Sequence, residues 1–106
     1  MQEIWLKYSE EYSISNYGKV KNNKTEKVLN PRLNSKGYLR VRLFGKEVFV
    51  HRMVAECFLP PSTKEFINHI NGNKKDNRLS NLEYCTASEN MLHYYRVLKP
   101  LLSQGA

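Results

Sequence analysis

The stretch 67-INHINGNKKDNRLSN-81 decides the fold of this chain. It holds one histidine, His69, among five asparagines, one glycine, one aspartate and three basic residues. The apolar residues at its start predict a strand over 66–70, and "LEYC" predicts a second strand over 82–85. The residues between them are rich in Asn and Gly, which is typical of a loop. Such a loop is either ordinary polar surface or an active site.

A capped helix follows the second strand. In "TASENMLHYYRVLK", Thr86 stands three residues before Glu89, which is the pattern of a capping box. Pro100 is expected to end this helix because proline cannot continue it. Residues 66–98 therefore predict a strand, a long loop, a strand and a helix. His69 lies on the first strand, so residues in the first turns of the helix can face it.

Three polar side chains are spaced along this unit. Asn81 lies twelve residues after His69, near the end of the loop, and Asn90 lies nine residues further on, in the helix. A lone histidine is more often structural than catalytic. A His, an Asn and then a His or Asn on a strand–strand–helix unit, however, form the H-N-H arrangement. The spacing therefore favours an active site.

The chain closely resembles the HNH nucleases of the ββα-metal group. The resemblance runs over 50–93, from "VHRMVAECFLP" through "INHINGNKKDNRLSNLEYCTASENMLH", and is nearest to the small phage and intron-encoded HNH homing endonucleases. "EIWLKYSEEYSISNYGKVKN" resembles the NUMOD4-like module that precedes such domains. The implied fold class is α+β, an N-terminal antiparallel β-ribbon or meander followed by a ββα-metal (HNH) motif. The implied division is a basic DNA-binding module over 1–47 and a nuclease region over 48–106.

The resemblance also implies a role for each polar residue. His69 stands at the position of the general base, and Asn81 at that of the residue that holds the loop in shape. Asn90 stands at the position of a metal ligand, and Asn68 where the family often has an aspartate as the second ligand. The implied cofactor is Mg²⁺, or else Mn²⁺ or another divalent cation. The implied reaction is hydrolysis of a DNA phosphodiester to a 5′-phosphate and a 3′-hydroxyl.

Asn68 departs from the family pattern. Mg²⁺ is a hard cation that favours carboxylates, whereas Asn68 and Asn90 are both neutral. We therefore expect metal binding to be weak without DNA and tighter with it. Asp76 is the only carboxylate in the loop and is a candidate to compensate. If Asn68 is a ligand, Asn68→Asp is expected to keep or raise activity.

Two further histidines have two interpretations each. His93 lies one helical turn after Asn90 on the same face, where it is either a possible support for the site or an ordinary helix histidine. His51 opens a predicted helix over 51–58, and a structural role is favoured for it. The apolar stripe expected along that helix consists of Val50, Val54, Cys57 and Phe58.

The N-terminal half predicts β-structure. "EYSISNYGKVKN" reads as two short strands around a turn, and residues 28–50 read as a β-meander. Strict alternation in "GYLRVRLFGKEVFVHR" places Tyr38, Arg40 and Arg42 on one face and apolar residues on the other, with Gly45 turning the chain. A two-stranded ribbon with arginines along one face has the width of a DNA groove.

Positive charge is concentrated in one part of the sequence. The chain has a net charge of +7, and residues 19–52 alone carry +8. A basic block of this kind is typical of a polyanion-binding face, although a basic surface without a partner is the alternative. The candidate DNA contacts are Arg40, Arg42, Lys36, Lys46, Arg52, Lys74, Lys75 and Arg78.

Two functions remain open from the sequence. The first is a metal-dependent DNA endonuclease that nicks DNA or cuts both strands, favoured by His69, Asn81 and Asn90. The alternative is a DNA-binding protein on an HNH scaffold with weak or lost cleavage, favoured by Asn68. The expected partner is double-stranded DNA, bound by a monomer or homodimer. With no apolar run of membrane length, no secretory signal and no Cys-x-x-Cys knuckle, we expect a cytoplasmic protein of a bacterial or phage-infected cell, without membrane association.

Overall fold

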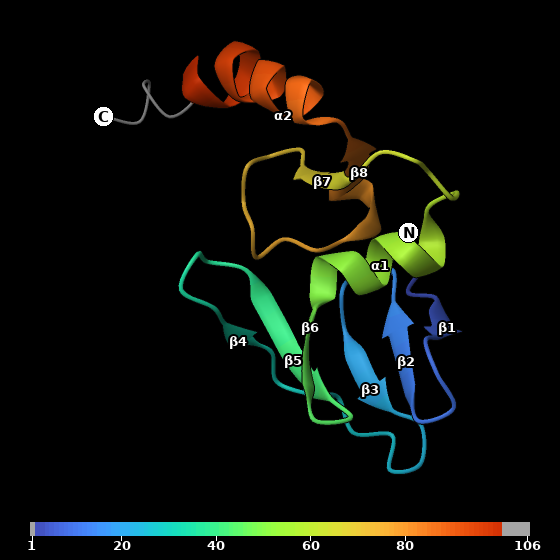
Figure 1. Cartoon of the computed structure of the whole chain (residues 1–106). Helices are drawn as coiled ribbons and strands as arrows, with labels where there is room; N and C mark the ends of the chain where they lie inside the picture. Colours follow the sequence, from blue (N-terminus) through green and yellow to red (C-terminus); the bar gives the residue numbers. More distant parts are fainter. Residues whose placement is uncertain (1, 101–106) are drawn as a thin grey trace.

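The computed structural model describes residues 2–100, and its strands form three small antiparallel sheets around one helix (Figure 1). The first sheet contains β1 (Trp5–Lys7), β2 (Tyr12–Ser15) and β3 (Val20–Asn22). The second contains β4 (Arg32–Leu33), β5 (Leu39–Leu43) and β6 (Lys46–Phe49). The third contains β7 (Phe66–His69) and β8 (Leu82–Cys85). The helical elements are α1 (Val50–Phe58), η1 (Leu79–Asn81), α2 (Ala87–His93) and the π-helical turn η2 (Tyr94–Leu98).

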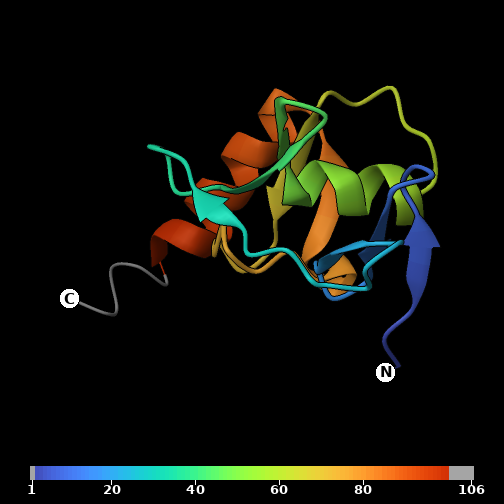
Figure 2. The same ribbon diagram turned by 90° about the horizontal axis from the view of Figure 1, so that it is seen from below.

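Helix α1 lies between the first sheet and α2 in Figure 1, and Figure 2 shows the same elements from below. Met53, Val54 and Ala55 of this helix are fully buried. The buried stripe is wider than the one expected from the sequence because α1 contacts all three sheets. A single hydrophobic cluster contains Ile14 and Val20 from the first sheet, Val41 and Leu43 from the second, Leu82 from the third, and Val50, Met53 and Val54 from α1.

The second sheet confirms the predicted alternation. Val41 and Leu43 are buried, whereas Arg42 between them is exposed. Phe44 and Gly45 both have positive φ angles, 53° and 74°, and form the two-residue loop between β5 and β6. Positive φ at both central residues is the geometry of a type I′ hairpin, whose twist matches that of the strands it joins.

The C-terminal part has the predicted strand–loop–strand–helix order, and the α+β fold class is confirmed. β7 and β8 pair so that Asn68 lies opposite Glu83 and His69 lies opposite Leu82. The predicted capping box is present in both directions at the start of α2. The helical path continues through η2 to Pro100, the last residue that the structure describes, so the prediction that the helix stops there concerns residues outside the described part. Within residues 2–100, no helix combines the length and apolarity needed to cross a membrane.

Candidate active site

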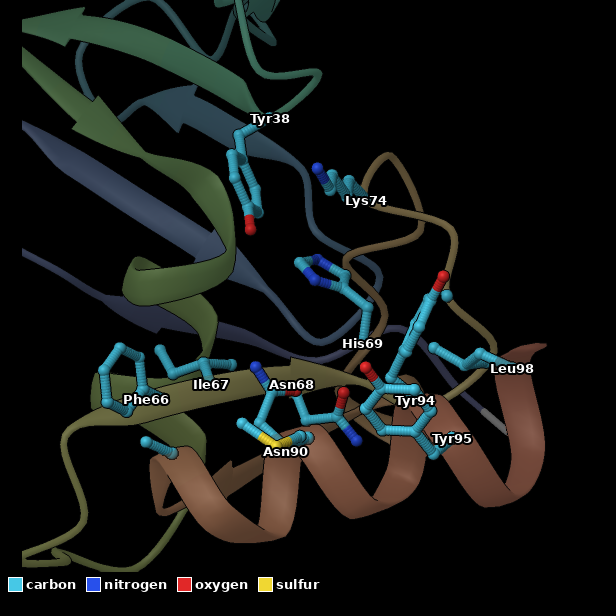
Figure 3. A pocket seen from close by; sticks show the side chains of 13 residues that line it. Tyr38, Phe66, Ile67, Asn68, His69, Lys74, Asn90, Tyr94, Tyr95 and Leu98 are labelled. Carbon is cyan, nitrogen blue, oxygen red and sulfur yellow. The ribbon is translucent and has the colours of Figure 1, made fainter.

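A cavity of about 490 Å³ lies between β7, α2 and the loop that connects β7 to β8 (Figure 3). Four of the residues singled out in the sequence line it, namely Asn68, His69, Lys74 and Asn90. Asn68 and His69 come from the strand, Asn90 comes from the helix, and Lys74 comes from the loop. The ββα unit therefore brings together side chains that lie up to 22 residues apart in the sequence.

His69 is held in one orientation by burial and by a hydrogen bond from its ring. It is almost fully buried, and its Nε2–H donates a hydrogen bond to Oδ1 of Asn77 at 2.8 Å. Because Oδ1 can only accept, Nε2 carries the hydrogen and Nδ1 keeps its lone pair. Burial lowers the pKa of His69, while Asn77 and Asp76 oppose that shift in part. His69 is therefore neutral at pH 7, as a general base must be.

Two aromatic side chains pack around His69 with their rings tilted to its own. The ring centroid of Tyr38 is 6.0 Å from that of His69 and 5.1 Å from that of His51, and the two histidine rings are 5.3 Å apart. Burial, followed by the neighbouring His69 and Arg52, lowers the pKa of His51 to about 4. His51 is buried beside the base and does not line its cavity, whereas Tyr38 does. Nothing in the sequence spacing connects Tyr38 with His69.

Asn81 holds the loop through several hydrogen bonds. Its Nδ2 donates to the backbone oxygen of Asp76 at 2.9 Å and to Oδ1 of Asn71 at 3.0 Å. Its own Oδ1 accepts from the backbone N–H of Asn71 at 3.0 Å. Asn81 does not line the cavity, so its contribution to the site is the shape of the loop.

Asp76 does not supply the missing carboxylate of the cavity. Its two oxygens accept from the guanidinium of Arg78 at 2.8 and 2.7 Å, and this pairing lowers the pKa of Asp76 to about 2. Asp76 is absent from the cavity lining, which corrects the suggestion that it could compensate for Asn68. Arg78, one of the candidate DNA contacts, is correspondingly engaged within the loop.

Asn77 is a site residue that the sequence reasoning missed. Its side chain is buried and accepts the hydrogen bond from His69. Gly18 of the N-terminal half packs against it, and a Cβ on Gly18 would lie 2.9 Å from the backbone oxygen of Asn77. In addition, the N–H of Leu79 donates to the backbone oxygen of Asn16 at 2.8 Å. The loop that holds the histidine is therefore supported by the turn between β2 and β3.

The candidate metal ligands are amides. Within residues 2–100 no three His, Cys, Asp or Glu side chains gather into a metal cluster. Nδ2 of Asn68 donates to Oε1 of Glu83 at 3.0 Å, which leaves the carbonyl oxygen of Asn68 for the cavity. Asn90 lines the same cavity. Amide oxygens are acceptable ligands for hard divalent cations, so these residues fit such an ion.

The remaining histidine and the candidate DNA-contacting residues lie in different parts of the structure. Nε2 of His93 donates to the backbone oxygen of Ile70 at 2.7 Å, which ties α2 to the end of β7. Lys74 donates to the backbone oxygen of Lys36 at 3.0 Å and lies 4.8 Å above the ring of Tyr38. Arg40 and Arg42 both pair with Glu47. Lys36 and Arg52 line a neighbouring cavity together with His51. Lys46 and Lys75 are exposed.

The chain matches two sequence families. Residues 48–92 match the HNH endonuclease family, and residues 3–44 match the NUMOD4 motif. An uncharacterised HNH endonuclease, L247 of Acanthamoeba polyphaga mimivirus, is 44% identical over 100 residues, which cover 87% of this chain and 25% of the relative. DNA endonuclease I-HmuI of Bacillus phage SP01 is 35% identical over 89 residues, which cover 79% of this chain and 51% of the relative.

A solved structure has the same fold. It is described as DNA binding and cleavage by the HNH homing endonuclease I-HmuI, and it superposes with a TM-score of 0.77 at 33% identity. The match covers 90% of this chain and 58% of that one. This chain thus spans between about a quarter and about half of the length of the two curated relatives named above.

Proposed function

This chain belongs to the HNH endonuclease family through residues 48–92, and from that premise we propose that it is a metal-dependent DNA endonuclease. The observation that carries the proposal is the convergence of Asn68, His69 and Asn90 on one cavity. His69 is held there as a neutral imidazole with its Nδ1 lone pair available. This arrangement suits hydrolysis of a phosphodiester by an activated water.

In the proposed reaction, Nδ1 of His69 takes a proton from water and the resulting hydroxide oxygen attacks the scissile phosphorus. The bond from phosphorus to the 3′ oxygen breaks, and that oxygen takes a proton from a solvent water, while His69 later returns its proton to solvent. The products are a 5′-phosphate and a 3′-hydroxyl. Asn77 can accept from Nε2–H in both the neutral and the protonated ring, and so keeps the ring in one orientation during the proposed step. A divalent cation, Mg²⁺ or Mn²⁺, held by Asn68 and Asn90 would supply positive charge against the phosphate.

The experiment that tests the proposal is cleavage of a supercoiled plasmid with Mg²⁺ or Mn²⁺, with and without EDTA, by the chain and by His69→Ala. We expect nicked or linear product only from the unmodified chain with metal. Equal trace cleavage by His69→Ala, or cleavage that EDTA leaves unchanged, contradicts the proposal.

A DNA-binding protein with weak or lost cleavage is the second candidate. The observation that favours it is that both candidate ligands, Asn68 and Asn90, are neutral amides. In the plasmid assay this candidate predicts a shift of the DNA on a native gel without any cleavage. If the chain does cleave, nicked circles indicate cutting of one strand, and linear plasmid formed without a nicked intermediate indicates double-strand cutting by a homodimer.

Double-stranded DNA is the proposed partner of the basic residues. We propose that Lys36, Lys46, Arg52, Lys74 and Lys75 contact phosphates, with a smaller contribution from the arginines that are already paired with acidic side chains. The logarithm of the affinity should then fall linearly with the logarithm of salt concentration. Lys46→Ala and Arg52→Ala should each reduce that slope by about 1. An affinity that does not change with salt, or a slope that neither variant reduces, contradicts these contacts.

A further inference from the structure

Asn68 and Glu83 form a pair of hydrogen-bond donor and acceptor across the third sheet. They are direct cross-strand partners, and Nδ2 of Asn68 donates to Oε1 of Glu83 at 3.0 Å. An ionised carboxylate can only accept hydrogen bonds, so Glu83 selects one orientation of the Asn68 amide. In that orientation Oδ1 points away from Glu83. Because Asn68 is buried and lines the cavity shown in Figure 3, this oxygen is the atom that it offers there.

Glu83 also places a negative charge directly behind a neutral candidate ligand. Among residues 2–100, Glu83 forms no ion pair, whereas Glu47, Asp76 and Glu89 are all paired with basic side chains. Glu83 does not line the cavity itself. A carboxylate that accepts a hydrogen bond from a ligand orients that ligand and makes it more basic.

We propose that Glu83 is a positioning residue for the metal site, acting through Asn68. It holds Oδ1 of Asn68 toward the cavity. Through the hydrogen bond with Nδ2 it also supplies the negative charge that a carboxylate at position 68 would bring directly. This inference rests on the proposed metal-dependent function. It also changes the expectation for Asn68→Asp, because that substitution alone sets two carboxylates about 3 Å apart where a hydrogen bond stood.

The test is a cycle of four proteins that differ at positions 68 and 83, all carrying His69→Ala so that DNA is bound and not cut. The proteins are the parent, Glu83→Gln, Asn68→Asp, and the double variant with both substitutions. Mn²⁺ binding to each protein on a short DNA duplex at low salt is measured from the electron paramagnetic resonance signal of the free ion. The same duplex without protein gives the background. Circular dichroism and thermal melting establish that each protein is folded.

We expect Glu83→Gln to weaken Mn²⁺ binding about tenfold when Asn68 is retained, since the charge behind the ligand is lost. In the Asn68→Asp background, the same substitution should not weaken binding. There the new glutamine amide can donate a hydrogen bond to the new carboxylate at position 68, which restores the pair with its polarity reversed. Glu65→Gln removes an equal charge from the exposed segment before β7 and should leave binding unchanged.

Equal losses from Glu83→Gln with Asn68 retained and in the Asn68→Asp background would show that Glu83 acts on the ion directly, which overturns the proposal. The proposal is also overturned if Glu83→Gln does not weaken Mn²⁺ binding at all, or if Glu65→Gln weakens it equally. If the parent complex bound no Mn²⁺ above the DNA background, the metal-dependent function itself would fall as well. The plasmid assay with EDTA reports that second failure separately from a failure of the role of Glu83 alone.

Discussion

The hydrogen bond between His69 and Asn77 is expected to set the protonation pattern of the base. Asn77→Leu removes the acceptor of the Nε2 hydrogen, so the imidazole loses its fixed tautomer and orientation. We expect single-turnover cleavage of plasmid DNA to fall at least about tenfold. The ¹⁵N chemical shifts of the His69 ring should show the Nε2–H form in the unmodified chain and a mixture of forms in the variant.

DNA binding provides the control for this prediction, because His69→Ala is expected to leave no cleavage to compare. If Asn77 acts only through His69, Asn77→Leu should leave DNA binding unchanged both with and without His69. Cleavage by Asn77→Leu at the unmodified rate, or an equal loss of DNA binding in both backgrounds, contradicts the positioning role of Asn77.

His51 makes the stability of the fold depend on pH. Its pKa is lowered to about 4 in the folded chain, chiefly by burial, against about 6.5 in the unfolded chain. The free energy of unfolding is therefore at its full value above pH 6.5 and falls as pH drops from 6.5 toward 4. Between pH 7.5 and 5 we expect a loss of about 2 kcal/mol, measured by urea unfolding.

His51→Phe is the matched variant because it keeps an aromatic ring between Tyr38 and Phe49. It should be clearly less sensitive to pH over the same window. Part of the slope remains, since burial also lowers the pKa of His69. Identical pH dependence in the variant and the unmodified chain would contradict the assignment to His51.

Spacing along the chain was sufficient to place some residues of the site but not others. His69 and Asn90 could be predicted because they lie on one local strand–strand–helix unit, whereas Asn68 was predicted through the resemblance to the HNH nucleases. Asn77 could not be distinguished from the four other asparagines of the stretch 67–81, because only the folded loop shows which one faces the imidazole. Tyr38 reaches the site from the second sheet, a contact that no local pattern encodes.

Among the elements, the turn between β2 and β3 is expected to support the loop that connects β7 to β8. Gly18 and Gly45 have similar positive φ angles, +82° and +74°, but only Gly18 has a close neighbour, the backbone of Asn77. Gly45→Ala should cost about 1 kcal/mol for the backbone conformation alone. Gly18→Ala carries the same cost and a further cost of about 1–3 kcal/mol from the contact with Asn77. Urea unfolding of both variants measures the difference.

The same pair of variants connects stability with activity. Gly18→Ala displaces Asn77 and should slow cleavage at a temperature where the protein is still folded, whereas Gly45→Ala should not. Equal stability losses and equal cleavage rates in the two variants would show that the turn does not support the loop.

Some strands and helices could be predicted from local sequence patterns, and others could not. The hairpin of β5 and β6, the strands β7 and β8 and the capped start of α2 follow from local alternation and capping chemistry. The three-residue strand β1 and the two-residue strand β4 carry too few residues for a periodic signal. They are strands because they pair with β2 and β5, which is information from distant parts of the chain.

For the whole molecule, the sequence predicted a DNA-binding module over 1–47 and a nuclease region over 48–106, and the packing of α1 predicts that these do not fold apart. Ile14, Val20, Val41 and Leu43 belong to the first segment and share one buried cluster with α1. Burial of each such side chain is worth about 1.5–3 kcal/mol, so the four together account for about 6–12 kcal/mol. That is comparable with the entire stability of a typical domain, about 5–15 kcal/mol.

A fragment of residues 48–106 should therefore lack a folded core, although it contains every proposed catalytic residue. Its amide proton–nitrogen spectrum is expected to be poorly dispersed, and its urea unfolding to lack a cooperative transition. Ile14→Ala in the full chain is the graded control, expected to lose about 2–5 kcal/mol because it leaves a cavity against α1. A fragment with a dispersed spectrum and a cooperative transition would instead make the ββα unit an independent domain. The contacts of Gly18 with Asn77 and of Asn16 with Leu79 would then serve to position the loop around His69, and not to keep the chain folded.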